Sequence, residues 1–100
     1  MLTKTQIYGL TDLLYPAFFA KEPALGYTQK QIGLWFDKAS REDLEESCTL
    51  LQTALALEDW DMRAALPGTP RTSEELRIFS RCALQQLRSL LEQRDQESNR

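Results

Sequence analysis

The fold depends on the longest uninterrupted helical pattern of the chain, SREDLEESCTLLQTALALEDWDMRAAL at residues 40–66. This segment contains no glycine or proline, and Ser40 with Asp43 marks a helix start. Apolar residues recur at helical spacing, with a gap at residues 58–59: Leu44, Cys48, Leu51, Leu55, Met62 and Leu66. Four more residues widen this apolar face: Leu50, Ala54, Leu57 and Trp60. A helix with so broad an apolar arc packs against several neighbours, so we expect a central helix over 40–66.

Three further helices are expected around this central one. The capping boxes predict helices over about 3–15, 28–37 and 73–94, and they are formed by Thr3 with Gln6, Thr28 with Gln31, and Thr72 with Glu75. Pro16 lies too deep in the pattern to be a first-turn proline, so the first helix is expected to stop or kink near residue 14 or 15. The connection LPGTPRT at residues 66–72 is short, which makes the helices over 40–66 and 73–94 antiparallel neighbours.

Composition supports an all-α fold. Leucine occurs seventeen times, isoleucine three times and valine never. Because β-branched residues favour strands, a chain without valine is typical of helices. One hundred residues suffice for one domain with a modest core. We therefore predict a small bundle of about four helices as a single domain over residues 1–94, followed by a frayed polar tail over residues 95–100.

The charge of the chain is unevenly placed. Its net charge is −3, but residues 37–61 carry eight acidic and two basic side chains, a balance of −6. Residues 62–94 carry six arginines and three glutamates, a balance of +3. The simpler interpretation is that two antiparallel helices of opposite sign lie side by side. The alternative is an arginine face that binds an anionic partner.

Neither a membrane span nor a secretory signal is expected. No stretch approaches the ~20 apolar residues that a membrane span needs, and residues 1–20 lack a charged start and a cleavage site. We predict a soluble, cytoplasmic protein with no membrane partner. Cys48 and Cys82 lie in helical patterns on two different helices, ~13 Å apart along the helix axis by a rise of ~1.5 Å per residue. A disulfide needs a shorter distance, so two reduced core thiols are expected.

Residues 27–47 resemble a helix-turn-helix in pattern but not in charge. The first residues of the second helix would meet the bases of DNA in such a motif. Here they are one arginine and four acids, which a duplex would repel: Arg41, Glu42, Asp43, Glu45 and Glu46. Carboxylates in a first turn instead stabilise the positive end of the helix dipole. DNA binding through residues 40–47 is therefore not expected.

The residue types that most catalysis requires are absent from the sequence. The chain has no histidine, which removes serine and cysteine triads and most zinc sites. Its four glycines are isolated and form no phosphate-binding loop. Carboxylate catalysis remains as an alternative, but the acidic clusters at 42–46 and 58–61 are typical of solvated helix surface. We predict no enzyme activity, no catalytic residues, no metal site and no cofactor.

Two features are candidates for a partner-binding surface. Seven of the nine aromatic residues lie in the first 36 positions. Core packing is the simpler explanation for most of them, and an exposed remainder at Phe18, Phe19 and Trp35 would bind protein. The second candidate is a row of arginines on the last helix, Arg77, Arg81 and Arg88, for which a solvated face is the simpler explanation.

We therefore favour a non-catalytic module that binds another protein, as an adaptor, an assembly factor or an inhibitor. The last class includes the small inhibitors that phages and mobile elements make. The alternative is a nucleic-acid-associated regulator that uses the arginines of the last helix. A homodimer that extends the small core through the helix over 40–66 or 73–94 is a further alternative.

Overall fold

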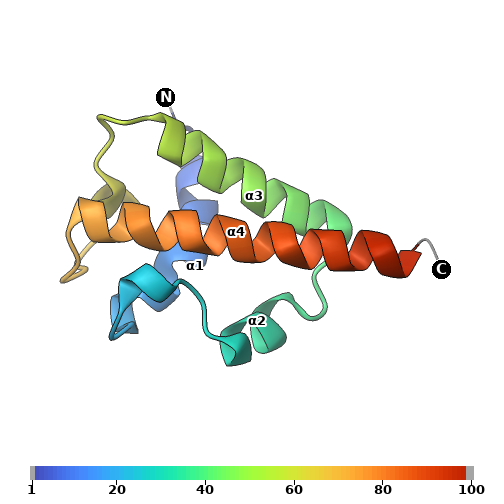
Figure 1. Cartoon of the computed structure of the whole chain (residues 1–100). Coiled ribbons are helices and arrows are strands. Elements are labelled where there is room, and N and C mark those ends of the chain that lie inside the picture. Colours follow the sequence, from blue (N-terminus) through green and yellow to red (C-terminus); the bar gives the residue numbers. More distant parts are fainter. Residues whose placement is uncertain (1, 99–100) are drawn as a thin grey trace.

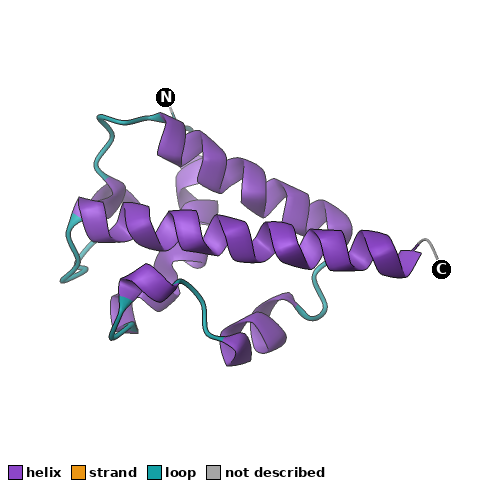
Figure 2. Ribbon diagram, in the orientation of Figure 1, coloured by secondary structure: helices purple, strands orange, loops and turns teal. Residues whose placement is uncertain are grey.

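The computed structural model describes residues 2–98, and all the regular secondary structure in this part of the chain is helical. In chain order the elements are α1 (Lys4–Phe19), the short 3₁₀ helix η1 (Pro23–Leu25), α2 (Gln29–Phe36), α3 (Arg41–Ala56), the 3₁₀ helix η2 (Met62–Ala65) and α4 (Ser73–Ser98). Figure 2 shows helices joined by loops, and no strand occurs among these residues. The predicted all-α bundle of four main helices is confirmed.

The two longer C-terminal elements organise the bundle. Figure 1 shows α3 and α4 side by side and running in opposite directions, as the short connection between them predicted. α1 crosses behind them and contacts both, while η1 packs against α4 on the side away from α3. α2 lies beyond η1 at the edge of the bundle. The molecule therefore has α3 and α4 at its centre, with α1 packed across both and α2 at the edge.

One core joins these elements. Its largest fully buried side chains come from α1, α3, η2 and α4: Leu10, Leu14, Leu44, Leu51, Met62, Leu76, Phe79 and Leu87. The ring of Tyr27 packs between those of Phe36 and Phe79, with centroids 5.3 Å away in each case. Burial raises the pKa of Tyr27 well above its usual range, so its hydroxyl stays protonated and donates to the carbonyl oxygen of Leu13.

The predicted end of the third helix at residue 66 is wrong. α3 ends at Ala56, residues 57–61 form a turn, and η2 follows. The turn lies at the gap in the apolar pattern, where Glu58 and Asp59 have no apolar side chain to bury in the core. Met62 and Leu66 are still buried, but from a separate element that the turn redirects. An arginine of α4 donates to the carbonyl groups of the chain at this turn.

The predicted end of the first helix at residue 15 is also wrong, because α1 continues through Pro16 to Phe19. Proline removes one N–H from the helical ladder and usually breaks a helix interior. Here Pro16 is buried, and the last turns of α1 receive donors from elsewhere. The hydroxyl of Tyr27 lies 2.5 Å from the carbonyl oxygen of Leu13, and Nε of Arg71 lies 3.1 Å from that of Ala17.

The last helix is longer than the predicted range of 73–94. α4 continues to Ser98, and the carboxylate of Asp95 lies 2.8 Å from Nη1 of Arg41 at the start of α3. The predicted tail over 95–100 therefore begins as helix, and its last two residues lie outside the described part of the chain.

Both cysteines are free thiols, as predicted. Cys48 is buried in the core, and this burial raises the pKa of its thiol. Cys82 is only half-buried, and its thiol donates to the carbonyl oxygen of Ala24 at 2.8 Å. η1 approaches α4 closely at this point because Gly26 has a φ of 68° and no side chain: a Cβ there would lie 2.9 Å from that of Cys82.

None of the helices in residues 2–98 combines the length and the apolar character needed to cross a membrane.

Candidate protein-binding surface

Arg77 of the predicted arginine row points into the protein. Its side chain is 8% exposed, and it lies against the turn that follows α3. The guanidinium donates to four backbone carbonyl groups at 2.5 to 3.4 Å, those of Leu55, Leu57, Glu58 and Trp60. A guanidinium offers five N–H donors in a fixed fork, which suits a cluster of carbonyl groups at a helix end. Arg77 is therefore part of the framework.

Two other arginines have the same role at other helix ends. Arg94 donates to the carbonyl oxygens of Phe36, Asp37 and Ala39 at the end of α2, and Arg71 donates to that of Ala17 near the end of α1. None of the described helices α1, α2 and α3 carries a basic residue in its own last turn. Since the C-terminal end of a helix dipole is negative, each of these helices is stabilised by an arginine from a distant part of the chain.

Four of the six arginines in residues 62–94 are thus already bound to other groups of the chain itself. Arg63 pairs with Asp61 at 2.8 Å, and Arg71, Arg77 and Arg94 bind carbonyl groups. Arg81 and Arg88 are exposed on α4. The expected face of three arginines is therefore reduced to two.

The aromatic residues of α1 show the opposite behaviour. Tyr8, Tyr15 and Phe19 are 70%, 50% and 68% exposed. They stand seven and then four residues apart, which places them on one side of a helix, here called the α1 stripe. The rings of Tyr15 and Phe19 meet edge to face with centroids 5.4 Å apart, so they form one continuous surface.

The predicted aromatic patch is divided by the fold. Phe19 lies in the α1 stripe and Trp35, 45% exposed, lies on α2, whereas Phe18 is half-buried against the core. Tyr8 and Tyr15 were missed as candidates. Their spacing from Phe19 was a usable signal, but it required α1 to continue past Pro16.

A groove opens beside the α1 stripe, between α1, the α2–α3 connection and α3. It has a volume of about 570 Å³. Its floor and walls are mainly apolar and include Leu13, Trp35, Phe36 and Leu50. Its polar residues comprise three acids and one lysine: Asp12, Asp43, Glu46 and Lys38, with Ser47. We call this the acidic groove.

α2, which forms one wall of the groove, is held mainly near its ends. α2 has eight residues, and Phe36 is the buried one among them. Before its start, Gln86 of α4 accepts from the N–H of Tyr27 at 2.8 Å and donates to its carbonyl oxygen at 2.7 Å. At its end, Arg94 binds the last carbonyl groups. On the opposite wall, Gly9 lets α1 approach α3, since a Cβ there would lie 2.8 Å from Cδ1 of Leu50.

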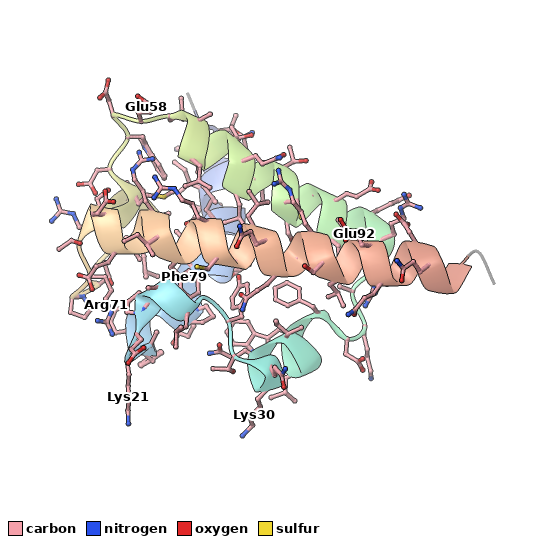
Figure 3. The ribbon with its side chains drawn as sticks, viewed as in Figure 1. Lys21, Lys30, Glu58, Arg71, Phe79 and Glu92 are labelled. Carbon is pink, nitrogen blue, oxygen red and sulfur yellow. The ribbon has the colours of Figure 1, made fainter. Side chains whose placement is uncertain are left out.

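A second hollow of about 410 Å³ lies at the other end of α2. Phe19 and Pro16 of α1, Leu25 of η1 and Gln31 of α2 contribute to its lining. Figure 3 shows Lys21 and Lys30, near this hollow, pointing away from the bundle. The side of the molecule formed by α1 and α2 is therefore indented at both ends of α2, with exposed aromatic rings at each indentation.

Within residues 2–98, no three side chains of the types that bind metal ions are grouped in a way that could hold one. Comparison of the chain with protein-family models, curated proteins and solved structures finds no match. What the chain does has to be inferred from its own surface, on which the α1 stripe and the acidic groove are the features that the core does not explain.

Proposed function

We propose that this chain is a non-catalytic protein-binding module, of the adaptor, assembly-factor or inhibitor class, that docks a partner on the α1 stripe and the adjoining groove. The observation that carries the proposal is the exposure of Tyr8, Tyr15 and Phe19 along one helix face. Single apolar side chains on a surface are ordinary, but the touching rings of Tyr15 and Phe19, with Tyr8 about two turns away on the same face, form an aromatic surface of the kind typical of an interface. Tyrosine and tryptophan are also the residues most enriched among interface hot spots.

The rigidity of α1 supports this proposal. Leu10 and Leu14 are fully buried on the opposite face of the same helix, and the Thr11 hydroxyl donates to the carbonyl oxygen of Ala65 at 2.6 Å. The stripe is therefore presented on a fixed helix. Little conformational entropy is lost when such a preorganised surface binds, so more of the contact energy appears as affinity.

The alternative of a nucleic-acid-associated regulator is less favoured. Such a protein would need a dense row of cations, and Arg77 is committed to backbone carbonyl groups. The exposed pair Arg81 and Arg88 is a weak basis for binding a polyanion. We place the proposed module in the cytoplasm, since its two free thiols, Cys48 and Cys82, suit a reducing compartment.

The test is capture of a partner from the native cell by the tagged chain, followed by reconstitution with the purified partner. Phe19→Ala and Tyr8→Ala should each weaken the reconstituted complex by about tenfold or more, because truncating a hot-spot residue costs ~2 kcal/mol. Leu34→Ala is the matched control: Leu34 is 70% exposed but belongs to neither indentation. Circular dichroism should show unchanged helicity in all three variants.

A complex whose dissociation constant is the same for Phe19→Ala, Tyr8→Ala and the Leu34→Ala control would contradict the proposed docking surface. Turnover of a substrate by the purified chain would contradict the non-catalytic class.

A further inference from the structure

We infer that the acidic groove binds a short segment of the partner protein in which a large apolar side chain is flanked by lysine or arginine. This inference rests on the proposed function and goes further, because it specifies the chemistry of the bound segment. It is carried by two independent features of the groove: its apolar floor and the sign of the charges around it.

The floor provides a place for an apolar anchor. Leu13, Phe36 and Leu50 reach the groove from three different elements, and the half-exposed indole of Trp35 forms a wall. Pockets that hold such groups typically measure several hundred Å³ and combine apolar walls with a few polar groups. The groove has room for a small number of large side chains, which points to a short segment rather than to a whole domain face.

The rim selects for positive charge. Asp12 comes from α1, Asp43 and Glu46 come from α3, and Lys38 is the cation that faces them. The formal charge of the lining is therefore −3 + 1 = −2. Among the described residues, the ion pairs join Arg41 to Glu45 and Asp95, Arg63 to Asp61, and Arg71 to Glu75. None of them involves the three rim carboxylates.

Rim charges of one sign determine which partner is accepted. They attract a complementary segment and repel one of like charge, which affects specificity more than total affinity. An acidic segment would meet three carboxylates here, whereas lysine or arginine side chains beside an apolar anchor would pair with them. Because arginine and lysine can also lay their aliphatic stems on apolar surface, such residues suit both the rim and the floor.

A second copy of this chain fits the surface less well. Asp12 lies between Tyr8 and Tyr15 on the same helix face, beside the groove. In a two-fold dimer the same patch of both copies is in contact, so carboxylates of one copy would approach those of the other. The exposed Arg81 and Arg88 lie on α4, and their contact with the groove of a neighbour would be head-to-tail.

The experiment is a selection from a random 12-residue peptide library displayed on phage, with the full chain immobilised. The enriched peptides should share a large apolar residue flanked by lysine or arginine. Their synthetic versions should bind the double variant Asp12→Asn, Glu46→Gln about tenfold more weakly, from ~0.7 kcal/mol for each rim pair. Trp35→Ala should also weaken them, and raising the salt concentration should have the same effect.

The matched control is the double variant Glu58→Gln, Glu92→Gln, which changes the net charge by the same amount. Both residues are exposed and outside the groove lining, and Figure 3 shows them at the end of α3 and on α4. Binding to this control should stay within about twofold of the unmodified chain, since remote exposed charges are screened at physiological salt.

Several results would overturn the inference. These are the absence of enriched peptides, enriched peptides without a basic bias, and equal binding to both double variants. A dimer found by sedimentation and weakened by Trp35→Ala would make a second copy the occupant instead. If any of these occurs while capture of the partner still depends on Phe19 and Tyr8, the proposed function survives without the groove inference. If basic peptides bind the groove but capture of the partner does not depend on Phe19 and Tyr8, the groove inference survives and docking on the α1 stripe is overturned.

Discussion

α4 and α1 place their side chains in opposite ways. The charged side chain of Arg77 points inward from α4 and donates to four carbonyl groups in the last turn of α3 and the turn that follows it. α1 leaves Tyr8 and Phe19 in solvent, where no other element covers them. A buried charge needs its hydrogen bonds satisfied, and those of Arg77 hold the turn after α3, whereas an exposed aromatic surface is typical of an interaction site. The arginine is therefore structural, and the aromatic residues form the docking surface that we propose.

Among the arginines, the largest expected effect comes from Arg77→Ala. Truncation removes the donor of all four carbonyl groups, of which that of Leu57 still accepts from the N–H of Trp60, so the free energy of unfolding should fall by about 3 kcal/mol. Urea unfolding followed by circular dichroism measures this change. Arg81→Ala is the matched control, because the same truncation at an exposed position of the same helix should change the free energy by less than about 0.5 kcal/mol. Equal losses in the two variants would remove the distinction between the buried and exposed arginines.

A smaller and more local effect is expected from Arg94→Ala. Arg94 binds the last carbonyl groups of α2, and α2 has few other attachments. The free energy of unfolding should fall by about 1–2 kcal/mol. Amide hydrogen exchange should accelerate most over residues 29–39, because a helix that is held at its ends opens locally when one end is released. Arg88→Ala is the control, and uniform acceleration over the whole chain in Arg94→Ala would show that α2 does not open separately.

Helix starts could be predicted from the sequence, whereas three of the four helix ends could not: α2 ends at Phe36, close to the expected residue 37, but α1, α3 and α4 end elsewhere. The predicted starts are confirmed, since Thr3, Thr28 and Ser40 precede α1, α2 and α3, and Thr72 exchanges hydrogen bonds with Glu75 before α4. A capping box is a contact between residues three apart, so it is visible in the sequence. The ends of α1 and α3 depend on donors that are distant in sequence.

Two such donors are arginines: Arg71 donates to the carbonyl oxygen of Ala17 in the last turn of α1, and Arg77 holds the turn after α3. The length of α1 also decides the candidate surface. Once α1 extends to Phe19, this residue joins Tyr8 and Tyr15 on one face. The groove could not be predicted at all, because its lining residues come from three elements and the local sequence pattern does not show how these elements pack together.

A substitution on the exposed face of α1 is expected to have a very small effect on the stability of the fold. Phe19→Ala should change the free energy of unfolding by less than about 0.5 kcal/mol, because a side chain that is already in solvent loses little burial. Leu14→Ala, on the buried face of the same helix, should cost about 2–5 kcal/mol. Urea midpoints of the two variants give the test. A large loss in Phe19→Ala would mean that the α1 stripe is packed against the chain itself and is not available to a partner.

The smallest effect is expected where an arginine makes an ordinary surface pair. Hydrogen bonds from the side chain and the backbone of Arg63 lower the pKa of Asp61 to about 2. Because this pKa is lower in the folded chain than the usual value of 3.8, the pair stabilises the fold fully above about pH 4. The stabilisation is lost as the pH falls from there towards about 2.

Asp61→Asn keeps the oxygen that accepts from the Arg63 N–H but removes the charge. Its urea midpoint should lie slightly below that of the unmodified chain at pH 7, and the difference should shrink below pH 4. A difference for Asp61→Asn that stays constant from pH 7 to pH 3 would mean that the charge of this pair contributes nothing.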